Sequence, residues 1–410
     1  MTPMRVTTAH SYDTTISQLT KRQSDLVEQQ ERISSGKRVV RASDDPVAAA
    51  LAESVQTRLS RITSDQRAID ASRTSMQQAE GALGEAGDLI QRVRDLMVAG
   101  GNAAYGDTQR EALAAQMEGL REQLFSVANR QDSAGRSLFG GLGGSSTPFV
   151  QEYGSGSGQV RFDGQRGQQA ATDVRLPQSM DGNTVFMRVP QGNGTFVLDQ
   201  GAANTGSARS DIGKVTNLST LTGHDYQIDF ADVAGVIQYS VTDLTTATPV
   251  AGQTGVTYTA GMQVEFDGMS FQLTGAPKAG DTMSIAPADS PTDLFKVMQD
   301  AIDALRTPTN DTGDSARRTQ DLGRSLTELD AGHDRVLLAR AQAGEWLNRA
   351  DTIEDLLGDR EVDHTAEKSS LEDLDMVKGI SEFQAQQVGL EAAMKSYASI
   401  QKLSLFQYVS

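Results

Sequence analysis

The stretch Ser369–Ser410 reads SSLEDLDMVKGISEFQAQQVGLEAAMKSYASIQKLSLFQYVS. Within it, residues that recur at alternating spacings of four and three mark one side of a helix. These residues are Met376, Ile380, Phe383, Gln387, Leu390, Met394, Tyr397 and Gln401. Ser369 and Ser370 are candidate caps for its start. The stretch therefore predicts a helix with one seam to bury.

A second stretch near the N-terminus has the same spacing. Its members are Tyr12, Ile16, Leu19, Gln23, Leu26, Gln30 and Ile33. Neither stretch has enough chain beside it to form a core of its own. A lone helix of this length is marginal in water, because packing of the apolar face supplies most of its stability. We therefore expect the two helices to pair with each other, with copies of themselves, or both.

Glutamine occupies several positions of these seams. The glutamines concerned are Gln23, Gln30, Gln387 and Gln401. Polar residues at such positions cost stability, and they specify register and partner number. We interpret them as a sign of terminal helices that pack in a defined multi-subunit arrangement.

Composition narrows the class of protein. A chain of 410 residues has room for two or three domains, and its 38% apolar content suffices for real cores. The formal charge of −17 argues against a nucleic-acid partner, whose phosphates would be repelled. Cysteine is absent, which excludes disulfides and thiolate sites. No apolar run approaches the roughly 20 residues of a membrane span, and the first residues lack the apolar core of a secretory signal peptide.

Proline divides the chain into helical flanks and a different middle. Seven of the ten prolines fall from Pro148 to Pro291, and proline breaks helix interiors. In the first flank, Gly36 reads as a helix stop, and Asp44, Asp45 and Pro46 read as the start of the next helix. The four-three spacing then continues in three helices, which we expect over Val55–Met97, Leu113–Val127 and Leu322–Ala350. The second should fold back antiparallel on the first.

The middle alternates short strand-like runs with turn pairs. We expect strands at Val160–Phe162, Thr184–Val189, Gln238–Val241 and Met262–Phe266. The turn pairs are Asp163-Gly164, Asp181-Gly182, Asn193-Gly194 and Asp267-Gly268. The run from Val264 to Leu273 is the clearest hairpin. Helix resumes at Ser290–Asp293, where Pro291 fits the first helical position.

These patterns predict a mainly α fold with a β-rich insertion. Both chain ends should build a long antiparallel helical bundle, with β hairpins and a small β domain at its tip. We place terminal helices in residues 1–42 and 366–410. The helical bundle with its hairpins then takes residues 43–194 and 289–365, and the projecting β domain takes residues 195–288.

Catalytic motifs are weak in this sequence. The four histidines are scattered, and His333 fits a partly buried position on the helical seam better than a ligand. Gly154–Gly158 is glycine-rich but lacks the rest of a phosphate-binding loop. Asp44 and Asp45 have the chemistry of a general acid and base, but helix capping explains them better. We expect no catalytic residue, cofactor or metal, and keep an enzyme site in the β insertion as a disfavoured alternative.

Two motifs resemble the start of bacterial flagellins and their relatives: RISSGKR at Arg32–Arg38 and ASDDPVA at Ala42–Ala48. The resemblance covers about 140 N-terminal and 120 C-terminal residues, and the β insertion is the part that varies in that family. Within the family, the Asp-Asp-Pro ending and LSLFQYV at Leu403–Val409 are similar to the hook–filament junction members. Flagellin usually has Asp-Asp-Ala and a different last turn.

The resemblance implies a structural role without catalysis. Such proteins are exported unfolded by the flagellar type III apparatus and form a ring at the hook–filament junction. The implied partners are further copies of the chain, hook-associated protein 1 on one side, flagellin on the other, and an export chaperone. The terminal helices would form the inner tube, and the β domain would project outward. A filament flagellin remains an alternative, and so, less favoured, does a secreted coiled-coil protein of an injection-type system.

Combining the seams with the resemblance gives a set of candidate interface residues. They are Tyr12, Ile16, Leu19, Gln23, Leu26, Ile33, Phe383, Gln387, Leu390, Met394, Tyr397, Leu405 and Phe406. Gly36, Asp44, Asp45 and Pro46 are expected to fix the turn between the terminal helices and the bundle.

Overall fold

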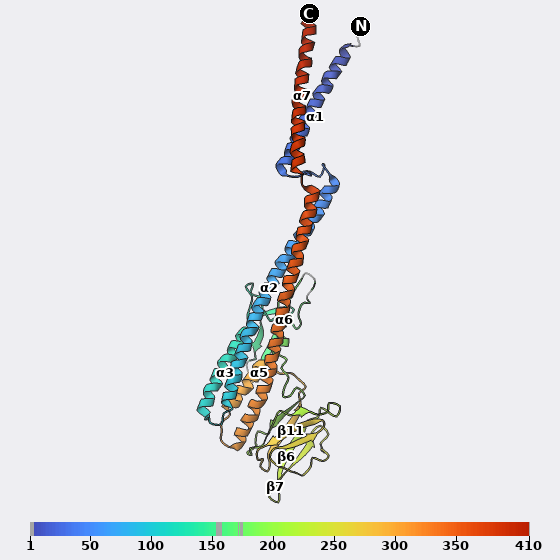
Figure 1. The fold of residues 1–410 in the computed structure, drawn as a ribbon. Helices are drawn as coiled ribbons and strands as arrows, with labels where there is room; N and C mark the ends of the chain where they lie inside the picture. The colour runs from blue at the N-terminus through green and yellow to red at the C-terminus, as the bar shows by residue number, and fades with distance from the viewer. Residues whose placement is uncertain (1–3, 153–157, 171, 173–174, 410) are drawn as a thin grey trace. The chain divides into compact units, whose positions relative to one another are not determined.

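The computed structural model describes residues 4–152, 158–170, 172 and 175–409 (Figure 1). The chain divides into two compact units, one of Met1–Arg67 with Thr352–Ser410 and the other of Ala68–Asp351. The helices are α1 (Met4–Ser35), α2 (Pro46–Gly100), α3 (Asp107–Ala128), α4 (Gly182–Phe186), α5 (Leu294–Arg306), α6 (Thr312–Glu372) and α7 (Met376–Val409). Helices α2 and α6 each contribute residues to both units.

In the first unit, helices from the two chain ends run side by side. In the pair of α1 with α7 and in the pair of α2 with α6, the residues that meet lie far apart in the sequence. Gln66 Nε2 donates to Glu361 Oε2 at 2.9 Å, and Lys368 Nζ donates to Gln56 Oε1 at 2.5 Å. Val55 and Ile62 are buried on α2, as is Leu357 on α6. The start of α2 and the end of α6 therefore pack as an antiparallel pair with a small apolar core.

The second unit contains a larger helical core. It is built from α2, α3, α5 and α6, whose apolar faces converge on one continuous cluster. Four phenylalanines at its centre make ring contacts with one another, and Phe149 lies 5.5 Å from Phe186 and 5.9 Å from Phe295 between ring centroids. Phe149 belongs to β1 (Gly144–Gln151), which pairs antiparallel with β2 (Val160–Gly164). This hairpin is thus part of the helical core.

Residues 196–287 form a β domain with its own apolar cluster, which shares no residue with the helical one. One sheet has the order β3-β12-β6-β7-β8 with β9 beside β7, and the other has the order β10-β11-β4 with β5 beside β11. Their strands are β3 (Phe196–Gln200), β4 (Arg209–Ser210), β5 (Lys214–Val215), β6 (Tyr226–Val233), β7 (Val236–Asp243), β8 (Thr248–Pro249), β9 (Val256–Thr257), β10 (Met262–Phe266), β11 (Met269–Thr274) and β12 (Thr282–Pro287). Figure 1 shows them together, in green to yellow.

The structure confirms the expected fold class, a mainly α chain with a β-rich insertion. It also confirms the hairpin at Val264–Leu273: Asp267 and Gly268 have φ of 49° and 71°, as a two-residue turn with both central residues left-handed requires. The Asp267-Gly268 pair and the alternating residues on either side of it were therefore enough to predict this hairpin from the sequence.

The strand expected at Thr184–Val189 is wrong. Residues 182–186 form helix α4, because the Asp181 carboxylate accepts the Asn183 N–H at 3.0 Å and caps it. Val185 and Phe186 are buried in the helical core rather than in a sheet. Asp181-Gly182 is therefore a helix start, not a hairpin turn.

Three further local predictions fail for tertiary reasons. Asp163-Gly164 lies inside β2, where Gly164 pairs with Gly144, instead of forming a turn. Pro291 precedes α5, because Thr292 pairs with Val189 and Asp293 is the cap. Ser369 and Ser370 continue α6, and the cap of α7 is Asp375, whose carboxylate accepts the Lys378 N–H at 3.1 Å.

The packing of Gly182 generates a stability prediction. A Cβ at this position would lie 2.6 Å from the Phe139 carbonyl oxygen and 2.7 Å from the Phe149 ring. Gly182→Ala should therefore lower the free energy of unfolding by about 1–3 kcal/mol through overpacking. Gly119→Ala is the matched control: Gly119 is exposed in α3 with open space around it, so alanine should stabilise by roughly 0.5–1 kcal/mol. Urea unfolding of both variants checks this, and equal effects would contradict it.

Candidate interface on the paired terminal helices

The pairing of α1 with α7 brings together part of the expected seam. On α1, Tyr12, Leu19, Leu26 and Ile33 are half-buried, and on α7 so are Phe383, Leu390 and Tyr397. The rings of Tyr12 and Tyr397 meet edge to face, with 6.3 Å between centroids and an interplanar angle of 86°. The two helices run antiparallel, because Gln29 lies against Gly379 at the other end of the pair.

Other expected seam residues are not brought together. Gln23 and Gln387 are exposed, and Ile16 and Met394 are 49% and 50% exposed. Leu405 and Phe406 lie within α7, but their side chains, and that of Gln401, are outside the described residues. The side of each helix predicted from spacing is thus wider than the side that the partner helix covers.

Gln29, which sequence reasoning missed, is the buried polar residue of the α1–α7 seam. It is 6% exposed, and its Nε2 donates to the Gly379 carbonyl at 3.2 Å, whereas Gln30 is exposed. Leu26 and Ile33 are seven residues apart, so a step of three or of four between them fits the pattern equally well. The sequence analysis therefore predicted a glutamine in the seam correctly, but it selected Gln30 instead of the adjacent Gln29.

A backbone clasp closes the base of this pair. Gly36 ends α1 with φ of 70°, and its carbonyl accepts the Leu374 N–H at 2.9 Å. The Arg38 N–H donates to the Glu372 carbonyl at 2.6 Å, and Lys37 Nζ lies 2.8 Å from Glu372 Oε2. The turn after α1 is therefore tied to the turn before α7.

The two aspartates of the connecting turn both act as backbone acceptors. Asp44 Oδ2 accepts the Arg41 and Val40 N–H groups at 2.9 and 3.1 Å, and these bonds hold its pKa below the ordinary value. Asp45 Oδ1 accepts the Ala48 N–H at 3.0 Å, which with Arg38 lowers the pKa of Asp45. Pro46 begins α2 directly after this cap. These hydrogen bonds give both carboxylates a structural role in the turn.

Large apolar side chains remain exposed on both terminal helices. On α7, Val377 and Val388 are 83% and 66% exposed, and eleven residues, about three turns, place them on one face. On α1, Val27 is 58% exposed and shares a face with Ile16 by the same spacing. The pair thus buries one seam and leaves a second apolar surface open to a partner.

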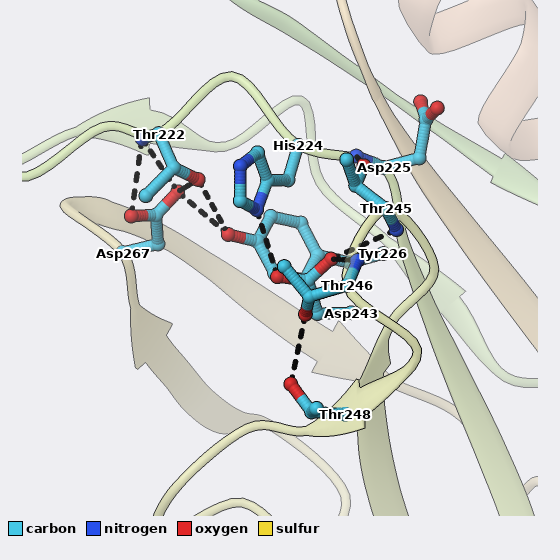
Figure 2. Close-up of polar contacts among 9 residues, drawn as sticks. All are labelled: Thr222, His224, Asp225, Tyr226, Asp243, Thr245, Thr246, Thr248 and Asp267. Atoms are coloured by element: carbon cyan, nitrogen blue, oxygen red, sulfur yellow. Dashed lines mark hydrogen bonds and ion pairs between the residues drawn. The ribbon is translucent and has the colours of Figure 1, made fainter.

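The β domain contains the polar network that most resembles catalytic machinery (Figure 2). His224 Nδ1 lies 2.8 Å from Asp243 Oδ2, and the Thr222 hydroxyl lies 2.8 Å from the Tyr226 hydroxyl. Tyr226 in turn donates to Asp267 Oδ2 at 2.9 Å, so the threonine is joined to a tyrosine and not to the histidine. A nucleophile, base and orienting acid in series are therefore not assembled here.

Loop fixation explains this network. Asp243 Oδ1 accepts the Thr245 and Thr246 N–H groups at 2.9 and 3.0 Å, which shapes the turn after β7. Burial alone would raise the pKa of Asp243, but hydrogen bonds from His224 and Thr246 outweigh it and hold that pKa at about 2. Burial is also the main reason why the pKa of Tyr226 is raised to about 12.

Metal and membrane sites are equally unsupported. Among the described residues, no cluster of histidine and acidic side chains is suited to hold a metal ion. Within the same part of the chain, every helix is too short or too polar to span a bilayer.

Comparison with known proteins links both parts of the chain to the flagellum. Residues 6–143 match the family model of the bacterial flagellin N-terminal helical region. Residues 200–287 match the model of the flagellar hook-associated protein 1 D2-like domain. The β domain thus resembles a domain of a hook-associated protein, a similarity that the match of the N-terminal helices to flagellin does not reveal.

Matches to whole proteins discriminate between members. Flagellar hook-associated protein 3 of Escherichia coli K12 is 26% identical over 98% of this chain and 99% of its own length. The crystal structure of hook-associated protein 3 from Legionella pneumophila has a TM-score of 0.71 and 28% identity, covering 78% of this chain and 98% of that one. Polar flagellin F of Vibrio parahaemolyticus is 31% identical, but over only 33% of this chain and 35% of its own.

The network around Asp243 predicts a pH dependence. Its folded-state pKa of about 2 lies below the roughly 3.9 of an unfolded aspartate, so its stabilising effect is present above about pH 4 and is lost as pH falls toward 2. Asp243→Asn should therefore speed amide exchange in β6 and β7 at neutral pH, and the difference from the parent should shrink below about pH 4. Asp225→Asn, at the residue directly before β6, is the control and should change little, because the Asp225 side chain points away from the network (Figure 2).

Proposed function

We propose that this chain forms an adaptor ring between hook and filament. It is a structural component of the bacterial flagellum that is similar over its length to hook-associated protein 3 and distinct from filament flagellin. In this ring the terminal helices of each copy pack against those of its neighbours. The observation that carries the proposal is the second apolar surface on α1 and α7. Such a surface invites aggregation on a free monomer and is explained by burial in an assembly.

The candidate interface residues divide into two roles under this proposal. Those that are half-buried, such as Leu19, Phe383 and Leu390, hold α1 and α7 together within one copy. Those that stay exposed, such as Ile16, Met394 and Gln387, face the next copy. The ordering cost of the terminal helices is then offset by apolar burial upon joining the ring.

The three segments expected from the sequence take three positions in this proposal. Residues 1–42 and 366–410 form the inner tube, residues 43–194 and 289–365 the next layer, and residues 195–288 the outward projection. One side of the ring docks on hook-associated protein 1 and the other receives flagellin. An export chaperone holds α7 before type III export to the outside of the cell, and no step requires catalysis.

The copy number of the chain per flagellum tests the function. Quantitative mass spectrometry of sheared, purified flagella should find about one ring of copies. Thousands of copies would mean a filament protein, and complete absence would return the chain to the secreted coiled-coil alternative.

The exposed apolar surface predicts an assembly defect. Val388 is 66% exposed, so Val388→Asp should leave the α1–α7 pair of the monomer intact while strongly reducing incorporation into flagella. Leu390→Asp should abolish incorporation and also disturb the pair, because Leu390 is half-buried in it. In both variants the second unit should stay folded.

A matched control separates assembly from general insolubility. Leu218 is 79% exposed in the β domain, so Leu218→Asp introduces the same charge away from the terminal helices. It should incorporate normally in motility and fractionation assays. Normal flagella from the Val388→Asp strain would refute the role of this surface.

A further inference from the structure

The contact between the β domain and α6 in the second unit has an unusual chemistry. Side chains at steps of three and four along one face of α6 all reach polar groups of the β domain or of the chain leading to it. Arg317 donates to the Ala202 carbonyl at 2.8 Å, and Glu328 Oε1 accepts the Gly192 N–H at 2.7 Å. Arg324 pairs with Asp199. These side chains belong to neither the helical nor the β apolar cluster, so we call this face of α6 the polar dock.

Gln320 sits at the centre of the dock and is 8% exposed. Its Nε2 donates to the Leu198 carbonyl of β3 at 2.9 Å, and its Oε1 accepts the Ser210 N–H of β4 at 3.0 Å. Both strands are the last of their sheets, so each presents unpaired backbone groups. The carboxamide thus takes the place of one peptide group between two sheet edges.

Several features show that this dock is imperfectly closed. Gln200 Oε1, Ser210 Oγ and Arg317 Nε are buried there without a hydrogen-bond partner among the described residues. A cavity of about 230 Å³ lies along the same face, between Gln320 and Arg324 of α6 and Ser210 of β4. Docking gives these polar atoms no hydrogen bond to protein, so they add little to the net free energy of the contact.

Buried acids add to this weakness. Burial raises the pKa of both Asp321 and Glu328 on α6, and Arg324 opposes the shift in each case. A carboxyl group with a raised pKa in the docked state makes docking weaker as pH rises through that pKa. The charged groups around the dock are Asp199, Arg209 and Asp211 of the β domain, Asp300 of α5, and Arg317, Asp321, Arg324 and Glu328 of α6.

We propose that the β domain is a detachable module, which docks on α6 through the Gln320 carboxamide and undocks with both hydrophobic cores intact. The connecting segments meet at a backbone bridge, where Val189 and Thr292 exchange two bonds of 2.8 Å, and again next to the sheet, where the Ala288 N–H donates to the Thr195 carbonyl at 2.9 Å. This bridge is the joint about which the module moves. The proposal stands on contacts within the second unit and does not depend on ring formation.

A substitution that removes only the donor tests the proposal. In Gln320→Glu the ionised carboxylate has no N–H to donate to the Leu198 carbonyl. Two acceptors then face each other, so the module should undock. Protonation makes the side chain a donor and acceptor again, so lowering the pH should restore docking. Gln320→Met lacks both groups and should stay undocked at every pH.

The chain contains no cysteine, so spin labels will attach only at cysteines that are introduced. We place one at Leu218→Cys in the β domain and one at Leu338→Cys on α6. Both positions are well exposed. The label-to-label distance should be narrow in the parent, broad in Gln320→Glu at about pH 7.5, and narrow again at about pH 5.5. Gln342→Glu, an exposed glutamine of α6 away from the dock, is the control and should match the parent.

Amide exchange on the same variants distinguishes undocking from unfolding. Exchange at Ser210 and Gly192 should rise about tenfold or more in Gln320→Glu at neutral pH, while Ile228 and Val241 in the β core keep their protection. An unchanged narrow distance in Gln320→Met or in Gln320→Glu at neutral pH would overturn the proposal. So would a parallel loss of protection at Ile228 and Val241, because the domain would then unfold rather than detach.

Discussion

Two backbone hydrogen bonds hold the ends of this chain together, from Leu374 N–H to the Gly36 carbonyl and from Arg38 N–H to the Glu372 carbonyl. They join positions more than three hundred residues apart, at the point where α1 turns into α2 and α6 turns into α7. Because each helix is tied at its base, α1 and α7 meet in a fixed register along their length. The candidate interface therefore depends on this clasp: without it the two apolar seams would have no defined partner.

The pairing of α1 and α7 leaves part of each helix uncovered. Two helices can cover only one side of each other, so seam residues such as Leu26 and Leu390 are only half-buried. Val388 and Val27 stay exposed on other faces. In a self-sufficient domain such faces would be polar, so their exposure supports the proposal that helices of further copies cover them.

Sequence periodicity predicted the helices and the fold class well, because a four-three spacing over several turns has few other readings. It failed where a neighbour far along the chain decides. Thr184–Val189 alternates like a strand, yet Asp181 caps a helix there and Phe186 enters the helical core. Gln29 and Gln30 fit the seam equally well, and only the position of Gly379 selects the first. The roles of Gln320 and Glu328 had no signal at all, since their partners are backbone groups of the β domain.

The two ways in which this chain joins its parts differ in physical character, and the difference fits their tasks. The terminal helices use apolar side chains, and in the proposed ring each added copy would remove more apolar surface from water. The β domain instead meets α6 through Gln320, Arg317 and Arg324, where each contact replaces one made with water and the net gain is small. An interface of the first kind suits permanent assembly, and one of the second kind suits a module that changes position while its core stays folded. The apolar groups at the chain ends therefore suit the proposed ring, and the polar groups at the dock suit the proposed detachable module.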